Sequence, residues 1–205
     1  MPTPAADNSA ILANDLCRDC GICCDGILFT SVDVTAEEAD RLADAGLGIV
    51  GDDRGKLRFY LSCARLGEKG CTLYADRPAK CQAYYCNLTR GVMNETVEYA
   101  QAQETVLETK RSSAWLMANA PEGAVELRAE SKNPQNPAEV LPSKSIRELL
   151  TYCHLFLNQV ASERTLAENE QAYVLAAFEH LKRIDRQFGK TRLLVKYAEL
   201  VQALR

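Results

Sequence analysis

The sequence predicts a mainly α-helical protein with a few short strands, in which a cysteine-rich N-terminal module packs on a C-terminal helical bundle. Eight of the nine cysteines lie before Gly91, whereas apolar residues at helical spacing dominate the chain after it. The contents of 47% hydrophobic and 25% charged residues are typical of globular proteins. A chain of 205 residues can bury an adequate core without covalent cross-links.

Composition divides the chain into three regions, namely a polar N-terminal tail at 1–16, a cysteine-cluster module at 17–91 and a helical region at 92–205. Within the helical region, residues 121–142 contain four prolines. Proline lacks a backbone N–H and disrupts helix interiors, so this segment is predicted to be a loop.

Short elements are predicted between the cysteines of the module. Residues 27–30 are apolar enough for a strand, and residues 56–61 alternate as a strand that leads into Cys63. The segment Thr35-Ala-Glu-Glu38 has the pattern of a capping box, which predicts a helix from there to Gly46 or Gly48.

The second half of the module is predicted to contain a turn and a helix. Residues 67–70 begin and end with glycine, which predicts a turn that returns Cys71 towards Cys63. Asp76 is the predicted N-cap of a helix with Pro78 in its first turn, which carries Cys81 and can extend to Cys86.

The helical region is predicted to contain helices at 94–119, 143–160, 163–188 and 191–204. The third has the cleanest apolar stripe, formed by Leu166, Tyr173, Val174, Ala177, Leu181, Ile184 and Phe188. The last is predicted to bury Leu194, Ala198 and Val201.

The charge of the chain argues against several classes of partner. The net charge is −4 and neither half is basic, so a nucleic-acid surface or an anionic membrane surface has no electrostatic support. No apolar run approaches the length of a membrane span, and the first residues lack the pattern of a secretory signal. We therefore expect a cytoplasmic protein, in which reduced cysteines more often bind metals or act in catalysis than form disulfides.

Eight cysteines are candidate metal ligands because they follow turns rather than helical or strand periodicity. Cys17, Cys20 and Cys23 form two overlapping Cys-x-x-Cys units, a spacing that places sulfurs close enough to share an ion or a cluster. The other five candidates are Cys24, Cys63, Cys71, Cys81 and Cys86. The adjacent pair Cys23-Cys24 is awkward on one ion, which predicts two centres or a role for one thiol beside the metal.

An iron–sulfur cluster is favoured over zinc, although both remain open. The two histidines, His154 and His180, lie far from the cysteines in sequence, which leaves an all-thiolate donor set. Its opening spacing is similar to the bacterial ferredoxin run, but no cysteine-proline follows and Cys24 is extra. A cluster together with a separate zinc ion is a further alternative.

Other residues near these motifs have simpler interpretations. Cys153 continues the apolar stripe of its helix and is predicted to be a core residue. Asp25 is predicted to stabilise a turn. The basic residues close to the cysteines can either offset thiolate charge or form solvated surface; they are Arg18, Arg65, Lys69, Arg77 and Lys80.

The ordered cysteine motifs resemble the YkgJ-type CxxCxxCC family. The resemblance rests on the run Cys17–Cys24, on Cys63, on Cys71-Thr-Leu-Tyr74, on Arg77-Pro78-x-x-Cys81 and on Cys86, and it covers about residues 17–90. The family is described as a zinc- or iron-chelating cysteine-cluster domain, so the resemblance implies that these eight cysteines match its cysteines. A similar module occurs in the longer flagellin lysine N-methylases, but residues 92–205 match no methylase motif.

Three functions are compatible with these observations. The first is a metal-binding protein that chelates iron, as an iron–sulfur cluster, or zinc through clustered thiolates. The second is an iron–sulfur redox or methyl-transfer enzyme, with a substrate cleft supplied by the helical region. The third is a metal-handling or protein-interaction module with a purely structural zinc. The partner is a protein or small molecule that the sequence does not identify. No catalytic residues can be identified from the sequence.

Overall fold

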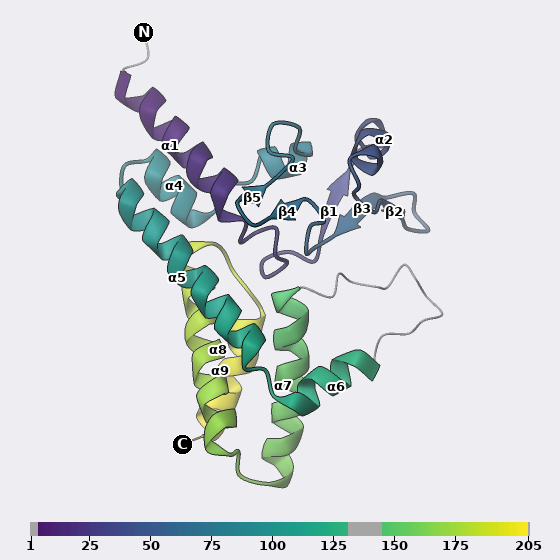
Figure 1. The fold of residues 1–205 in the computed structure, drawn as a ribbon, viewed down its shortest axis with the longest axis vertical. Helices are drawn as coiled ribbons and strands as arrows, with labels where there is room; N and C mark the ends of the chain where they lie inside the picture. The colour runs from purple at the N-terminus through teal and green to yellow at the C-terminus, as the bar shows by residue number, and fades with distance from the viewer. Residues whose placement is uncertain (1–3, 131–144, 205) are drawn as a thin grey trace. The chain divides into compact units, whose positions relative to one another are not determined.

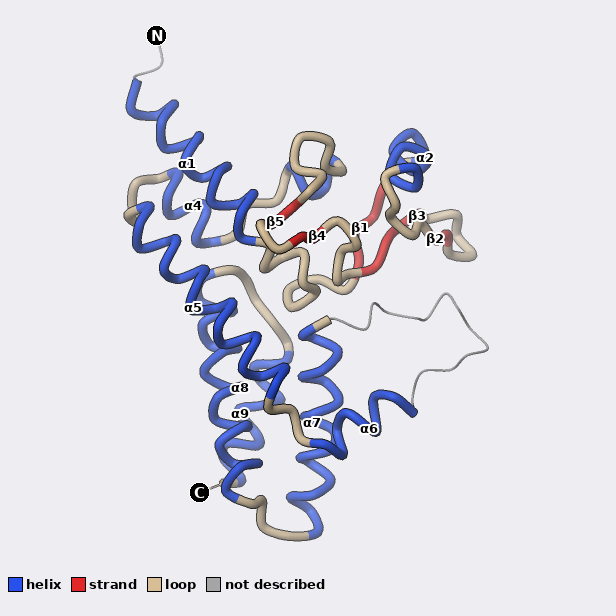
Figure 2. The backbone as a smooth tube through the Cα atoms, viewed as in Figure 1, coloured by secondary structure: helices blue, strands red, loops and turns tan. Residues whose placement is uncertain are grey.

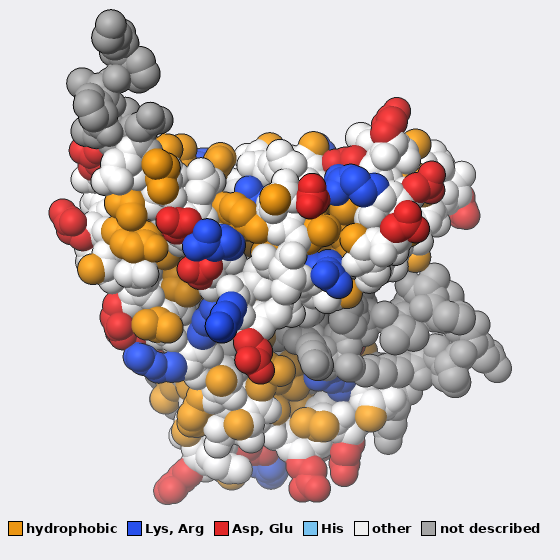
Figure 3. All heavy atoms as spheres, turned by 45° about the horizontal axis from the view of Figure 1, so that its top comes forward, with side chains coloured by type: hydrophobic (Ala, Val, Ile, Leu, Met, Phe, Trp, Pro, Cys, Tyr) orange, Lys and Arg blue, Asp and Glu red, His pale blue; other side chains and the backbone are white. Residues whose placement is uncertain are grey.

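The computed structural model describes residues 4–130 and 145–204, and the described part is mainly helical with five short strands (Figures 1 and 2). This confirms the predicted fold class. None of the described helices combines the length and apolar character needed to cross a membrane. On the face seen in Figure 3, acidic and basic side chains are interspersed rather than segregated.

The chain divides into two compact units, and the division differs from the predicted boundary after Gly91. The first unit extends to Val106 and includes Ser145, and the second contains the remaining described residues from Leu107 onwards. Helix α5 (Tyr99–Ala118) contributes residues to both units. Sequence composition changes at Gly91 because the cysteines end there, but the backbone contacts of the first unit continue into α5.

Helix α1 (Pro4–Cys20) occupies the region for which a polar tail was predicted, so that prediction is wrong for the described residues 4–16. Its residues Ala13 and Leu16 are buried, and α1 packs against α4 (Asn87–Met93), where Leu88 and Val92 are buried (Figure 1). The buried stripe of α1 is short and includes small residues, and it gives only a weak helical signal in the sequence.

A three-stranded antiparallel sheet has the order β1 (Ser31–Val34), β3 (Leu57–Tyr60), β2 (Val50–Gly51). Strand β3 confirms the prediction for residues 56–61, whereas the strand predicted at 27–30 is wrong, because strand pairing starts only at Ser31. Residues 27–30 lie in the preceding loop, where Ile27 is fully buried.

Helix α2 (Ala36–Asp44) begins with the predicted capping box. The Glu38 backbone N–H donates to Thr35 Oγ1 at 3.3 Å, and the Thr35 N–H donates to Glu38 Oε2 at 3.0 Å. Leu42 of this helix forms a core cluster with Leu47, Phe59 and Leu61. That cluster supports the base of the cysteine region, since Leu73, Cys63 and Cys81 pack against it.

A hairpin of β4 (Leu66–Gly67) and β5 (Gly70–Cys71) confirms the predicted turn at residues 67–70. The following helix α3 (Ala79–Gln82) carries Cys81 as predicted, but Pro78 rather than Asp76 occupies its N-cap position. Proline has no side-chain acceptor, and the N–H of Ala79, the first residue of this helix, donates instead to Glu38 Oε1 at 2.7 Å.

The second unit contains helices α6 (Glu122–Glu130), α7 (Ile146–Glu163), α8 (Glu168–Gln187) and α9 (Leu193–Ala203). Helix α7 packs against α6 and α9, and α8 packs against α9 (Figure 1). All seven residues of the stripe predicted at 163–188 are buried. The loop predicted at 121–142 is wrong for residues 122–130, which form α6 after Pro121, and residues 131–142 lie outside the described part.

Helix α9 buries a face shifted by one residue from the predicted one. Its buried residues are Leu193, Tyr197 and Leu200, whereas the sequence predicted Leu194, Ala198 and Val201. Apolar residues occupy both faces, so spacing alone cannot choose between them. The buried Tyr197 hydroxyl donates to the Leu150 carbonyl at 3.0 Å, a hydrogen bond that makes burial of this tyrosine favourable.

Candidate metal centre

All eight clustered cysteines belong to the first unit, and most of them lie at the end of an element or in a turn. Cys17 and Cys20 are on the last turn of α1, and Cys23 and Cys24 are in the turn that follows. The remaining four follow β3, end β5, lie within α3 and cap α4; they are Cys63, Cys71, Cys81 and Cys86. Folding thus brings together segments separated by up to about seventy residues, as the resemblance implied.

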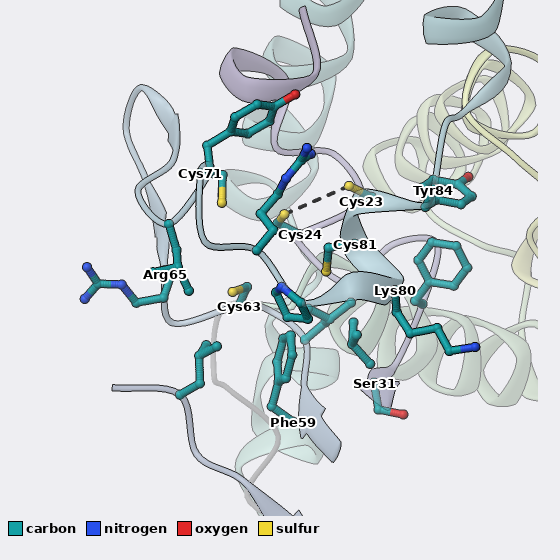
Figure 4. A pocket seen from close by; sticks show the side chains of 18 of the residues that line it. Cys23, Cys24, Ser31, Phe59, Cys63, Arg65, Cys71, Lys80, Cys81 and Tyr84 are labelled. Atoms are coloured by element: carbon teal, nitrogen blue, oxygen red, sulfur yellow. Dashed lines mark hydrogen bonds between the residues drawn. The ribbon is translucent and has the colours of Figure 1, made fainter. Parts of the chain in front are cut away.

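Six of the eight cysteines line a cavity of about 310 Å³ within this unit (Figure 4). They are Cys17, Cys23, Cys24, Cys63, Cys71 and Cys81. The rest of its wall is largely apolar and includes Phe59, Leu61 and Leu73. Cys20 and Cys86 do not line the cavity.

Four sulfurs surround a common space in Figure 4, those of Cys24, Cys63, Cys71 and Cys81. The Cys63 backbone N–H donates to the Cys24 carbonyl at 2.8 Å, which fixes these two segments beside each other. Cys71 is fixed by pairing with Leu66 in the hairpin. Backbone hydrogen bonds therefore position at least three of the four thiols independently of any metal.

The adjacent pair Cys23-Cys24 converges, since the two Sγ atoms lie 3.9 Å apart (Figure 4). The contact with Cys24 lowers the pKa of Cys23, and the same contact raises the pKa of Cys24. Burial adds to the increase at Cys24. Loss of the first proton from the pair is therefore easier than loss of the second.

Burial raises the pKa values of four more of the clustered thiols, Cys17, Cys20, Cys63 and Cys81. The pKa of Cys17 rises to about 11 and that of Cys81 to about 12, first because both are buried and then because other thiols lie near them. Burial also raises the pKa of Cys20, to which Cys23, Cys86 and Cys17 add. Metal ligation requires thiolates, so binding at these residues would release protons.

Arg77 is the cation in closest contact with the thiols. Its Nη1 atom donates to Cys17 Sγ at 3.7 Å, and its guanidinium lies 3.6 Å from the centroid of the Tyr74 ring. Arg77 also lowers the pKa of Cys17, against the larger effect of burial. Two other predicted cations, Arg65 and Lys80, line the cavity.

Arg18 belongs to the solvated surface, which was the second of the two roles predicted for the basic residues near the cysteines. It forms ion pairs with Asp15 and Asp19 at 2.9 Å, with about half of its side chain exposed. Lys69 does not line the cavity. Proximity in sequence to a cysteine was therefore a poor guide to which cations face the thiols.

Two aromatic residues of the wall were not identified as site residues from the sequence. Tyr74 donates from its hydroxyl to the Asn14 carbonyl at 2.8 Å and thereby connects the cavity wall to α1. Tyr84 meets Phe29 edge to face, with the ring centroids 4.9 Å apart. The motif Cys71-Thr-Leu-Tyr74 contained the signal for the first, whereas Tyr84 was interpreted only as a packing residue.

Cys153, His180 and Asp25, to which the sequence assigned other roles, do not line this cavity. Cys153 is fully buried among apolar residues of the second unit, as predicted. His180 is also in the second unit, where its Nδ1 atom lies 3.0 Å from Ser112 Oγ. Asp25 accepts a hydrogen bond from the Ile27 N–H at 2.8 Å, which confirms its predicted turn role.

The donor chemistry of the cysteine region fits zinc or an iron–sulfur cluster. Thiolates are soft ligands, and both of these centres are commonly held by four of them. Within residues 4–130 and 145–204, no three His, Cys, Asp or Glu side chains converge closely enough to hold a single ion in the present side-chain arrangement. The thiols instead surround the cavity, with cations on its wall.

Comparison with known proteins gives one match. No curated protein matches the chain, and no solved structure matches it. Residues 16–110 match a family model named CxxCxxCC, which carries the description "Putative zinc- or iron-chelating domain". The matched residues include all eight clustered cysteines and just under half of the chain. The N-terminal part of this protein is thus similar throughout to the CxxCxxCC metal-chelating domain, which confirms the resemblance inferred from the cysteine spacing.

Proposed function

We propose that this protein is a metal-binding protein whose first unit holds an iron–sulfur cluster through its clustered cysteines. The observation that carries the proposal is the cavity of about 310 Å³ lined by six thiols. The family description supports the chelation of zinc or iron. The choice of an iron–sulfur cluster over zinc is our own proposal.

The size of the cavity favours a cluster. Four sulfurs close directly around a zinc ion, with bonds of about 2.3 Å, and leave no space between them. A cluster of several iron and sulfide atoms needs a volume between its cysteines. The thiols of Cys24, Cys63, Cys71 and Cys81 surround such a volume (Figure 4).

The surroundings of the cavity also suit a cluster. Four thiolates leave an oxidised four-iron cluster with a charge of about −2, which nearby cations can offset. Arg77 already donates to a sulfur, whereas the charged ends of Arg65 and Lys80, which also line the cavity, point away from the sulfurs in Figure 4. The apolar residues Phe59 and Leu61 limit water access, and solvent exposure is one determinant of cluster potential.

Metal analysis of the full chain tests the proposal. The protein would be purified without oxygen and assayed for iron, zinc, acid-labile sulfide and visible absorbance. We expect iron and sulfide in similar amounts and a broad brown absorbance. A colourless protein with stoichiometric zinc and no sulfide would contradict the cluster and favour a structural zinc site.

A further inference from the structure

The eight cysteines can be divided into two sets of four, and Cys17 and Cys23 of the second set also line the cavity. The cavity set consists of the four thiols that surround a common space, Cys24, Cys63, Cys71 and Cys81. The helix set consists of the thiols at the junction of α1 and α4, Cys17, Cys20, Cys23 and Cys86. We propose that each set holds its own four-thiolate metal centre, and that the adjacent pair Cys23-Cys24 is the boundary between them. This division rests on the proposed metal-binding function.

Secondary structure places the helix set. Cys17 and Cys20 are three positions apart on the last turn of α1, so their side chains are neighbours on one helix face. Cys86 is the N-cap of α4, which packs against α1. Cys20 and Cys86 are also the two cysteines that do not line the cavity, so a centre within the cavity does not explain them.

The Cys86 thiol is held in place by neighbouring polar groups. Its Sγ atom accepts a hydrogen bond from the Thr89 N–H at 3.4 Å and lies 3.0 Å from Thr89 Oγ1. These contacts fix the position of the Cys86 sulfur at the N-terminus of α4.

The proximity of the thiols follows the same division. Cys23, Cys86 and Cys17 lie near Cys20, whereas Cys23, Cys63 and Cys71 lie near both Cys24 and Cys81. Cys23 lies near members of both sets, as expected for a boundary residue. Cys23 continues the Cys-x-x-Cys spacing from Cys20, which assigns it to the helix set.

Two centres account for the number of cysteines. Zinc and four-iron clusters each take four protein thiolates, so eight thiols are twice what one centre uses. The donor set of the second centre accepts either zinc or iron, and metal analysis distinguishes them.

The number of centres can be counted on the unmodified protein. Native mass spectrometry of the anaerobically purified full chain, combined with iron, zinc and sulfide analysis, should show the mass of two metal centres per chain. A mass corresponding to one centre would overturn the division. If sulfide is absent, the cluster proposal fails, but two zinc ions per chain still support two centres and one zinc ion overturns them.

Variants then assign the ligands. We expect Cys86→Ser to lose one centre and Cys63→Ser to lose the other, each retaining about half of the wild-type centres. Serine preserves the N-cap of α4, which limits the folding cost at position 86. The same-set double variant Cys20→Ser/Cys86→Ser should lose no more metal than Cys86→Ser. The cross-set double variant Cys63→Ser/Cys86→Ser should lose all of it. Complete metal loss from both single variants, or loss of the same centre from both, would overturn the division.

Discussion

At the scale of single residues, Arg77 combines several interactions at the cavity. It donates to Cys17 Sγ, stacks on Tyr74 and lines the cavity with its charge. Tyr74 in turn is hydrogen-bonded to Asn14 of α1. Because hydrogen bonds to the sulfurs tune cluster potentials, Arg77 is expected to influence the redox properties of a bound cluster.

Replacing Arg77 with leucine should therefore lower the reduction potential of the cluster. The wild-type arginine provides a hydrogen bond and a positive charge, and both favour the reduced cluster because it is more negative. A loss of about 1.4 kcal/mol in this stabilisation lowers the one-electron potential by roughly 60 mV. A redox titration followed by visible absorbance measures the shift. Arg18→Leu is the control, since Arg18 pairs with exposed carboxylates. An equal shift in both variants would contradict a local role for Arg77.

Glu170 gives a prediction that does not depend on metal. Arg164 donates to its two oxygens at 2.8 and 2.9 Å, and the Ala167 N–H donates at 2.8 Å. These contacts, that with Arg164 first, hold the pKa of Glu170 below its ordinary value. Stability from this lowered pKa is complete above the ordinary range near pH 4.3 and is lost as pH falls through the lower folded-state value.

Glu170→Gln should lower the free energy of unfolding by about 1 kcal/mol at pH 7. The difference from wild type should shrink below about pH 4, where the carboxylate of the wild type is itself protonated. Urea unfolding at both pH values measures it. Glu168→Gln, at an exposed position in the same first turn, should change stability by less than half as much. A pH-independent difference for Glu170→Gln would refute the charged interaction.

The candidate ligands were readily predicted from the sequence because thiol spacing is a direct signature of metal chemistry. Their surroundings were less predictable. Arg18 directly follows Cys17 in sequence but pairs with carboxylates, whereas Arg77 is not adjacent to any cysteine in sequence but contacts the Cys17 thiol. The convergence of the Cys23 and Cys24 sulfurs depends on the backbone angles of their turn, which cannot be read from the amino-acid sequence.

At the scale of elements, the hairpin β4–β5 positions Cys71 beside α1 through a glycine. Gly70 has a positive φ of 99°, and a Cβ atom there would lie 1.9 Å from the Arg18 carbonyl oxygen. The backbone of the hairpin therefore approaches the last turn of α1 more closely than any other residue would permit.

Gly70→Ala should displace Cys71 and reduce metal content by more than half, with a loss of about 2 kcal/mol or more in stability. Gly55→Ala is the matched control, since Gly55 also has a positive φ of 73° but a Cβ atom there would have no neighbour within 4 Å. That variant should lose about 1 kcal/mol and retain its metal. Metal analysis and denaturant unfolding of both variants test this prediction; equal metal content in the two would contradict it.

Elements with strong local signals were predicted well. The capping box of α2, strand β3 and the stripe of α8 all depend on interactions within a few residues. Helix α1 and the buried face of α9 depend on tertiary packing, against α4 and on the Tyr197–Leu150 hydrogen bond respectively. The packing partners of these two helices cannot be identified from composition. The four prolines of residues 121–142 predicted a loop, but Pro121 precedes α6 and does not interrupt it.

At the scale of the whole molecule, metal should contribute to the stability of one unit more than the other. In the first unit, the segment between α1 and α5 has short helices and strands, and one of its core clusters has four buried residues. The second unit has long helices with continuous buried stripes. Binding energy at a site that forms only on folding is also folding energy, so it should accrue to the first unit.

Removing the metal with a chelator should therefore increase hydrogen exchange selectively. We expect amides of β1 and β3 to lose at least about tenfold in protection, because the cluster of Leu42, Phe59 and Leu61 beside the cysteines loses support. Amides in α8 should change by less than about twofold. Equal losses in β3 and α8 would show that metal stabilises the chain as a whole.

The most direct test of the central claim compares two cysteines that differ in location but not in chemistry. Cys81 lines the cavity and Cys153 is buried in the second unit. Iron, zinc and sulfide would be measured per chain after anaerobic purification of Cys81→Ser and Cys153→Ser. We predict that Cys81→Ser loses at least half of the wild-type metal and sulfide, whereas Cys153→Ser retains wild-type amounts. Equal retention or equal loss in the two variants would contradict the claim that the clustered thiols bind the metal.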